Sequence, residues 1–172
     1  MLNFLFLKKI FSFLLSSFRL TSLPPFPLSK KSCPFCDKSI LEEQTILVGE
    51  EARALYCLTP ATLGNILIIP KRHIARFEKL KPKETIEIQN MISKISDAFR
   101  ELYKIHDYLI IQKNGKEAGQ TVSHIHFHII PCPKKALEII KMAFQYRKAI
   151  GKKEMSERTE ELRLFFLENN KK

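Results

Sequence analysis

Cysteine is scarce in this sequence, and so are long uncharged apolar stretches and acidic residues near the N-terminus. Four cysteines in 172 residues are too few for a disulfide scaffold, which favours a reducing compartment and hence a cytoplasmic protein. With 45% hydrophobic and 27% charged residues, the composition excludes a collagen, a disordered tail and a multi-domain machine. One domain with a modest core is expected.

Residues 1–32 contain five basic residues and no acidic one. Their longest uncharged run between the early charges, Ile10 to Phe18, is nine residues, which is about half of what a membrane-spanning helix needs. Lysines interrupt the apolar stretch and no small-x-small cleavage site follows it, so a secretory signal is not expected. We interpret the segment as an extension, with an organelle transit peptide or a membrane-surface helix as alternatives. Pro24, Pro25 and Pro27 mark its boundary and leave residues 33–172 as the folded domain with a helical tail.

The formal net charge of +11 favours a polyanionic partner, such as nucleic acid, an acidic membrane or a phosphorylated metabolite. Beyond residue 32 the chain has 24 basic and 18 acidic residues, so this part is only mildly basic. Its basic residues are scattered, and the aromatic-rich N-terminus lacks the pattern of a base-stacking platform. A nucleic-acid partner is therefore not expected.

Short apolar runs rich in β-branched residues alternate with turn residues from Thr45 onward. The runs at 45–58 and 65–70 predict consecutive antiparallel strands, and two further strands are predicted at 107–112 and 122–131. Apolar residues between Lys83 and Tyr103 recur at helical spacing, which predicts an amphipathic helix. Closing helices are predicted at 137–146 and 156–167. With no internal repeat, this order indicates an α+β domain: an antiparallel sheet with a helix packed on it and C-terminal helices.

Three histidines, His124, His126 and His128, alternate with apolar residues in the stretch SHIHFHIIP. On a strand, alternate side chains share one face, so three imidazoles are expected side by side while Ile125 and Phe127 face the core. A sheet surface does not need histidine for stability, which favours a functional site. Histidine serves both metal ligation and nucleophilic catalysis, and the row alone does not choose between them.

The stretch just before the histidines, Asn114 to Val122, supplies two glycines and several amide and hydroxyl groups. This composition suits a loop that holds phosphate oxygens, with Gln120 as a donor to a bridging or leaving oxygen. A plain hairpin loop is the alternative.

The pair Cys33 and Cys36 admits three interpretations: half of a zinc site, a redox pair, or two cysteines that are close by chance. No second C-x-x-C is present, so zinc would need two histidines, for which His73 and one end of the histidine row are candidates. No strand precedes the pair, which weakens the redox interpretation. His106 has no comparable context and is expected at the surface.

The stretch GQTVSHIHFHIIP resembles the signature of the histidine triad (HIT) family, in which three histidines alternate with apolar residues. The resemblance runs from about Cys33 to Pro131 and includes NILIIPKRH and NGKEAGQTV in the expected order. It implies a small α+β HIT fold, usually a homodimer paired through its sheets, that acts on purine nucleotides without a catalytic metal. We therefore expect an enzyme, a hydrolase rather than a transferase, that cleaves a nucleoside phosphoramidate or a dinucleoside polyphosphate at the α-phosphorus.

The resemblance also implies residue roles. His126 would be the nucleophile that forms a nucleotidyl-histidine intermediate, and His128 and Gln120 would hold the phosphate oxygens and the leaving group. Structural zinc, as in many bacterial members, would be bound by Cys33, Cys36, His73 and His124. The implied substrate-binding set is Asn114, Gly119, Gln120, Thr121, Val122, Ser123 and His128.

Two residues depart from the family pattern. Cys57 stands where members commonly have an Asp or Asn that binds ribose hydroxyls, and a thiol is a poorer hydrogen-bond partner. Asn65 stands where a histidine usually follows the glycine. The altered ribose position favours an alternative function, a zinc-stabilised nucleotide sensor or adaptor with little turnover, whereas the intact His126 and Gln120 favour the enzyme.

Overall fold

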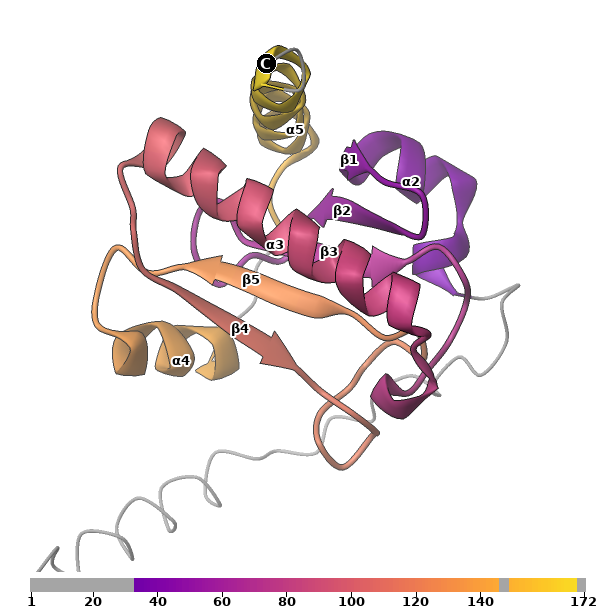
Figure 1. Cartoon of the computed structure of the whole chain (residues 1–172). Helices are drawn as coiled ribbons and strands as arrows, with labels where there is room; N and C mark the ends of the chain where they lie inside the picture. Colours follow the sequence, from indigo (N-terminus) through magenta and orange to yellow (C-terminus); the bar gives the residue numbers. More distant parts are fainter. Residues whose placement is uncertain (1–32, 146–148, 170–172) are drawn as a thin grey trace, which may run out of the picture.

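The computed structural model describes residues 33–145 and 149–169 (Figure 1), so the expectations for residues 1–32, including the proline boundary, lie outside the described residues. Five strands and four α-helices are described, with two short 3₁₀ helices. Their bounds are η2 Pro34–Cys36, α2 Lys38–Gln44, β1 Thr45–Val48, β2 Ala52–Tyr56, β3 Ile66–Pro70, η3 Phe77–Lys79, α3 Pro82–Tyr103, β4 Tyr108–Gln112, β5 Phe127–Pro131, α4 Ala136–Gln145 and α5 Lys152–Asn169.

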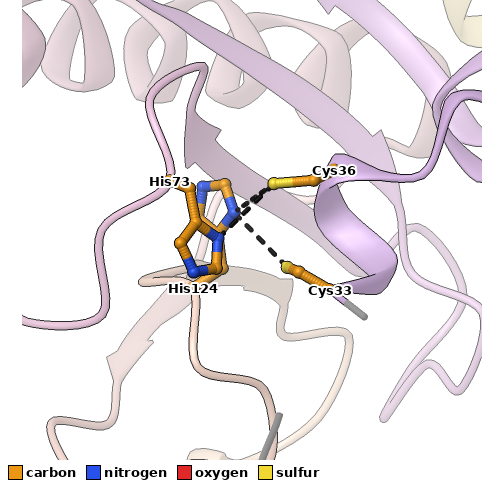
Figure 2. Close-up of side chains that lie close together, drawn as sticks. All are labelled: Cys33, Cys36, His73 and His124. Atoms are coloured by element: carbon orange, nitrogen blue, oxygen red, sulfur yellow. Dashed lines mark hydrogen bonds between the residues drawn. The ribbon is translucent and has the colours of Figure 1, made fainter. Parts of the chain in front are cut away.

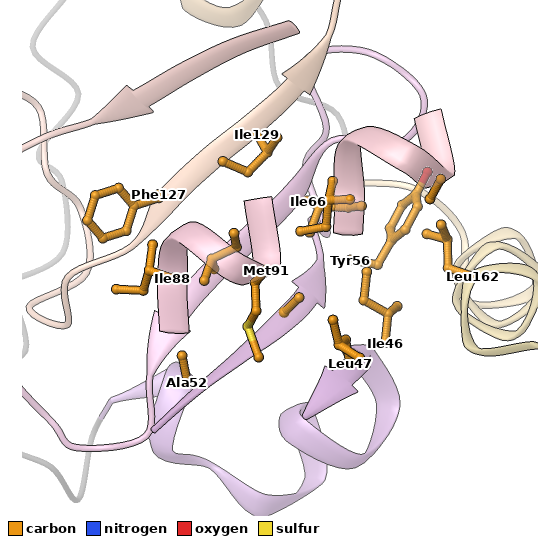
Figure 3. Packing of buried hydrophobic residues seen from close by; sticks show 14 of the residues in the cluster. Ile46, Leu47, Ala52, Tyr56, Ile66, Ile88, Met91, Phe127, Ile129 and Leu162 are labelled. Atoms are coloured by element: carbon orange, nitrogen blue, oxygen red, sulfur yellow. The ribbon is translucent and has the colours of Figure 1, made fainter. Parts of the chain in front are cut away.

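The strands form one antiparallel sheet in the order β1-β2-β3-β5-β4, as the sequence predicts for an α+β domain. Helix α3 lies across one face of this sheet (Figure 1). Its buried residues Ile88 and Met91 pack in one cluster with strand residues such as Ile66 and Ile129 (Figure 3), and Ile95 belongs to the same cluster. Burial of this apolar face holds the helix on the sheet. The opposite face is left for the site.

The predicted helix between Lys83 and Tyr103 is confirmed. It begins at Pro82, whose fixed φ suits the first helical turn, and the Glu84 carboxylate accepts a hydrogen bond from the Lys81 N–H at 2.7 Å. The closing helices are confirmed as α4 and α5, although Tyr146 lies outside the described residues. None of the described helices is long and apolar enough to cross a membrane.

The strand predicted at 122–131 is shorter in the structure, because β5 begins only at Phe127. Strand β3 pairs with β5 as far as the Ile68–Phe127 pair and ends at Pro70, which has no backbone N–H for the ladder. Before Phe127 the chain bonds instead to the segment after β3, where the Ile125 N–H donates to the Ile74 carbonyl at 2.6 Å. The prediction that all three histidines share a strand is therefore wrong, and only His128 lies on it.

Candidate active site and metal site

His126 and His128 lie together at the beginning of β5. Both are buried, with 5% and 8% of their surface exposed, and their ring centroids are 5.2 Å apart. The apolar residues between and beside them, Ile125, Phe127 and Ile129, belong to the core on the α3 side of the sheet. The alternation thus fixes which way the imidazoles point even though the strand starts late.

The backbone sets the tautomer of His126. Its Nδ1 atom lies 2.8 Å from the His124 carbonyl oxygen. Because a carbonyl only accepts, Nδ1 carries the proton, and the neutral ring then has its lone pair on Nε2. An imidazole held in this way is oriented as a nucleophile.

The loop before the histidines is held by its own side chains. Gln120 is buried, and its Oε1 accepts from the Gly115 N–H at 2.7 Å while its Nε2 donates to the Ala75 and Val122 carbonyls at 3.0 and 2.9 Å. Asn114 accepts from the Phe77 N–H and donates to Glu78, at 3.1 and 3.0 Å. Both amides therefore join the loop to the segment 75–78.

The other residues of the predicted substrate set lie in or after this loop. Gly119 has φ of 77° and Gly115 has φ of 108°, conformations that favour glycine and let the loop turn tightly. Thr121 and Gly119 are exposed, Val122 is half-buried and Ser123 is buried. The structure thus brings the set to one loop beside the histidines, but it gives Gln120 and Asn114 partners inside the protein.

Cys33, Cys36, His73 and His124 converge on one point (Figure 2), and their four candidate ligand atoms all lie within 4.8 Å of one another. The Cys36 Sγ lies 3.4 Å from His73 Nδ1 and 3.5 Å from His124 Nδ1, and the Cys33 Sγ lies 3.6 Å from His124 Nδ1. Ligands about 2.0 to 2.3 Å from a tetrahedral zinc ion are separated by roughly 3.3 to 3.8 Å. The donor set and its spacing fit a Cys₂His₂ zinc site.

Local structure orients three of the four candidate ligands, Cys33, Cys36 and His124. Pro34 begins the 3₁₀ helix η2, which turns both cysteines toward the same point. The His124 Nε2 lies 2.9 Å from the Pro70 carbonyl, so it carries the proton and leaves Nδ1 to face the cysteines. Burial lowers the pKa of His124 to about 4, which keeps the ring neutral, and burial together with the nearby Cys36 raises the pKa of Cys33 to about 11. A bound cation would favour the thiolate that burial disfavours.

Phe35 contacts the site although the sequence interpretation assigned it no role. Its ring meets His126 edge-on with centroids 5.2 Å apart, and the His124 ring at 6.0 Å. The position of Phe35 between the two cysteines is the signal that could have identified it. Phe35 connects the Cys33–Cys36 pair to His126 by direct packing.

The two departures from the family pattern are buried. Cys57 is 3% exposed in a small apolar cluster with Leu55, Leu67 and Ile69. Asn65 is 1% exposed, where its amide accepts from the Ala61 N–H and donates to the Ile66 and Ile129 carbonyls, each at 3.3 Å. Asn65 therefore helps join β3 to β5. His106 is exposed, as predicted.

Comparison with known proteins adds a family and several relatives. The sequence model of the HIT domain family matches residues 39–135 of this chain. An adenosine 5′-monophosphoramidase of Schizosaccharomyces pombe is 33% identical over 106 residues, 60% of this chain and 77% of the relative. A bis(5′-adenosyl)-triphosphatase of Dictyostelium discoideum is 31% identical over 137 residues, 77% of this chain and 92% of the relative.

Among solved structures, a Zn-bound histidine triad family protein from Mycobacterium smegmatis superposes with a TM-score of 0.65 at 26% identity. The match covers 83% of this chain and 99% of that one. A diadenosine triphosphate hydrolase of Plasmodium falciparum, at 23% identity and a TM-score of 0.63, shares the fold over 77% of this chain and 79% of its own.

Proposed function

Because the chain belongs to the HIT domain family, we propose that it is a nucleotide hydrolase acting at the α-phosphorus of a nucleoside phosphoramidate or a dinucleoside polyphosphate. The family match covers more than half of the chain, and the named relatives include a phosphoramidase and a dinucleoside triphosphatase. The observation that carries the proposal is the His126 ring, whose Nδ1 is committed to a backbone carbonyl while its Nε2 retains a lone pair.

In the proposed first step, the lone pair on His126 Nε2 forms a bond to the α-phosphorus. The bond from phosphorus to the leaving nitrogen or oxygen breaks, and the leaving group departs with that electron pair and gains a proton from solvent water. The imidazole cation that would form is stabilised at Nδ1, where the proton already lies against the His124 carbonyl. In the second step, water attacks the same phosphorus and releases a proton to the solvent, the P–N bond breaks and the electron pair returns to Nε2.

We assign the phosphate and leaving group to His128, Gln120 and the loop that follows Asn114. His128 packs beside the His126 ring and is well placed for a phosphate oxygen. The Gln120 amide already bonds three backbone groups, so it would act on the substrate chiefly by holding the loop, and direct contact would require exchange of one of these bonds. Gly119, Thr121, Val122 and Ser123 complete the proposed phosphate-binding set.

Zinc is the metal we propose for Cys33, Cys36, His73 and His124. Two thiolates and two neutral imidazoles at tetrahedral spacing suit zinc, whose bound form contributes directly to folding. The catalytic step is assigned to His126 alone and needs no metal in this proposal. The ion would lock η2, and with it Phe35, against the histidines.

A homodimer paired through the sheet edge at β4 is also proposed. Strand β4 is the outer strand next to β5, and its Ile110 is 49% exposed. An edge with unpaired backbone groups and an exposed isoleucine suits pairing with a second copy. We expect a cytoplasmic location, as the sequence predicts.

The deciding experiment is incubation of the protein with radiolabelled adenosine 5′-phosphoramidate and with diadenosine polyphosphates. Release of AMP from either substrate supports the hydrolase. Tight nucleotide binding without release supports the alternative, a zinc-stabilised sensor or adaptor. The internal hydrogen bonds of Gln120 and Asn114 and the buried thiol of Cys57 favour that alternative.

A further inference from the structure

The segment from Pro70, the last residue of β3, to Ile74 contacts both histidines of the proposed metal site. It carries His73, and its Pro70 carbonyl orients the ring of His124. Its ends are held by the backbone: the Lys71 N–H donates to the Glu51 carbonyl at 2.8 Å, and the Ile74 carbonyl accepts from Ile125 at 2.6 Å. Between these two points the His73 ring contacts Cys36 and His124, and a second side chain also anchors the segment.

That side chain is Arg72, which reaches away from the cluster to helix α3. Its Nε and Nη2 donate to the two oxygens of Glu84 at 2.9 and 2.8 Å, and Nη2 also donates to the Lys79 carbonyl at 2.9 Å. The Glu84 side chain is 1% exposed, and its Oε2 accepts from the Lys81 N–H as well. A two-pronged pair of this kind fixes direction as well as distance.

Glu84 stabilises the start of α3 as a cap, and its pairing with Arg72 adds a second contact. The carboxylate is buried whereas the Arg72 side chain is 41% exposed, and an ion pair that takes a carboxylate out of water often stabilises a fold no better than an apolar pair of similar size. What the pair does achieve is a single position for the backbone at Arg72, one residue before His73. The half-buried His73 ring contacts Cys36 and His124, and the position of the backbone at Arg72 helps to place this ring.

We infer that Arg72 and Glu84 are positioning residues for the metal, because their ion pair holds the Pro70–His73 segment where His73 and His124 can share one zinc ion. The inference rests on the proposed zinc site. In the absence of the pair, the segment would retain its backbone anchors but would sample several positions of His73. Zinc binding would then require ordering of this residue, and affinity would fall.

The test compares zinc affinity and release in five proteins: wild type, Glu84→Gln, Arg72→Lys, the double variant Arg72→Met with Glu84→Met, and Arg100→Gln. Arg100 pairs with Asp97 at the exposed side of α3 and serves as the matched control. Affinity is measured by competition with a chromogenic chelator, and thermal unfolding is followed with and without zinc. Arg72→Lys retains the positive charge but loses the paired hydrogen bonds to the two Glu84 oxygens, so it tests the effect of their geometry apart from that of charge. The double variant removes both charges and so leaves neither one buried alone.

We expect Glu84→Gln and the double variant to bind zinc about 10- to 100-fold more weakly, the range typical of residues that orient metal ligands. The zinc affinity of Arg72→Lys should lie between theirs and that of the wild type, and Arg100→Gln should bind zinc as tightly as the wild type. Equal zinc affinity in all five proteins, with lower melting temperatures for the Glu84 variants, would show a purely structural pair and overturn the inference. A wild type that binds no zinc would instead refute the proposed metal site itself.

Discussion

The Nδ1 atom of His126 lies 2.8 Å from the carbonyl oxygen of His124, whose own ring faces Cys33 and Cys36. One residue of the triad thus contributes its side chain to the proposed metal site and its backbone to the proposed nucleophile. Any force that holds the His124 ring therefore also holds the carbonyl that orients His126. This relationship places the proposed metal ligand and the proposed nucleophile two residues apart in the chain.

The first prediction concerns His126. His126→Ala should abolish turnover while leaving the melting temperature within a few degrees of the wild type, because the covalent step loses its nucleophile. The wild type, quenched with alkaline denaturant, should carry labelled nucleotide on His126 by mass spectrometry. His106→Ala, at an exposed histidine, is the control and should retain full activity. Substantial turnover by His126→Ala would refute the assignment.

The second prediction concerns the cysteine pair. Cys33→Ser and Cys36→Ser should each lose the roughly one zinc ion per chain expected of the wild type and should melt at a lower temperature, because structural zinc contributes to folding. Elemental analysis and thermal unfolding check both results. Cys132→Ser, at a cysteine outside the cluster, should bind zinc like the wild type. A wild type purified without chelator and free of zinc would count against the site.

The third prediction concerns Cys57, which the structure places among apolar side chains. Cys57→Asp should lower the free energy of unfolding by about 2 kcal/mol or more, because a carboxylate would be buried there. Cys57→Ala should cost about 1 kcal/mol, as expected for removal of one small buried group. Urea denaturation measures both. If Cys57→Asp is as stable as the wild type and binds a ribonucleotide more tightly than its dideoxy analogue, Cys57 faces the ribose instead.

The fourth prediction concerns Asn65. Asn65→Ala should lower the free energy of unfolding by about 2 to 3 kcal/mol, because it leaves buried backbone groups of β3 and β5 without their amide partner. Asn90→Ala, on the exposed side of α3, should change it by less than about 0.5 kcal/mol. Chemical denaturation of both variants measures these changes. Equal changes in the free energy of unfolding would show that Asn65 has no such structural role.

The fifth prediction concerns pH. Hydrogen bonds from Asn114 and then Arg76 lower the pKa of Glu78 to about 2, against an ordinary value of 4.5. The folded state thus binds this proton less tightly than the unfolded chain, so the stabilisation is present above pH 4.5 and is lost as the pH falls toward 2. Asn114→Ala should raise this pKa, as measured by carboxyl ¹³C NMR titration. Thr121→Ala, in the same loop, should leave it unchanged, and an unchanged value in Asn114→Ala would show that the amide does not act on Glu78.

Local patterns in the sequence were sufficient for most elements. The apolar spacing between Lys83 and Tyr103 predicts α3 within one residue at its start, since a periodic apolar face records burial directly. The strands β1, β2, β3 and β4 and the α+β class follow from the same kind of local signal. The strand containing the histidines was predicted too long, because its length depends on where its pairing with β3 stops, at the Ile68–Phe127 pair.

For the site, too, the sequence predicts some features and tertiary contacts decide the others. The alternation of His124, His126 and His128 marks a candidate site, because this pattern needs only neighbouring residues. The meeting of Cys36 with His124, 88 residues apart, is decided by the packing of η2 against the sheet. Only the tertiary structure could show that the Gln120 amide forms its hydrogen bonds inside the protein, since its partners depend on how the loop folds. The Arg72–Glu84 pair likewise forms only once β3 and α3 are in place, because long-range contacts have no signature in local periodicity.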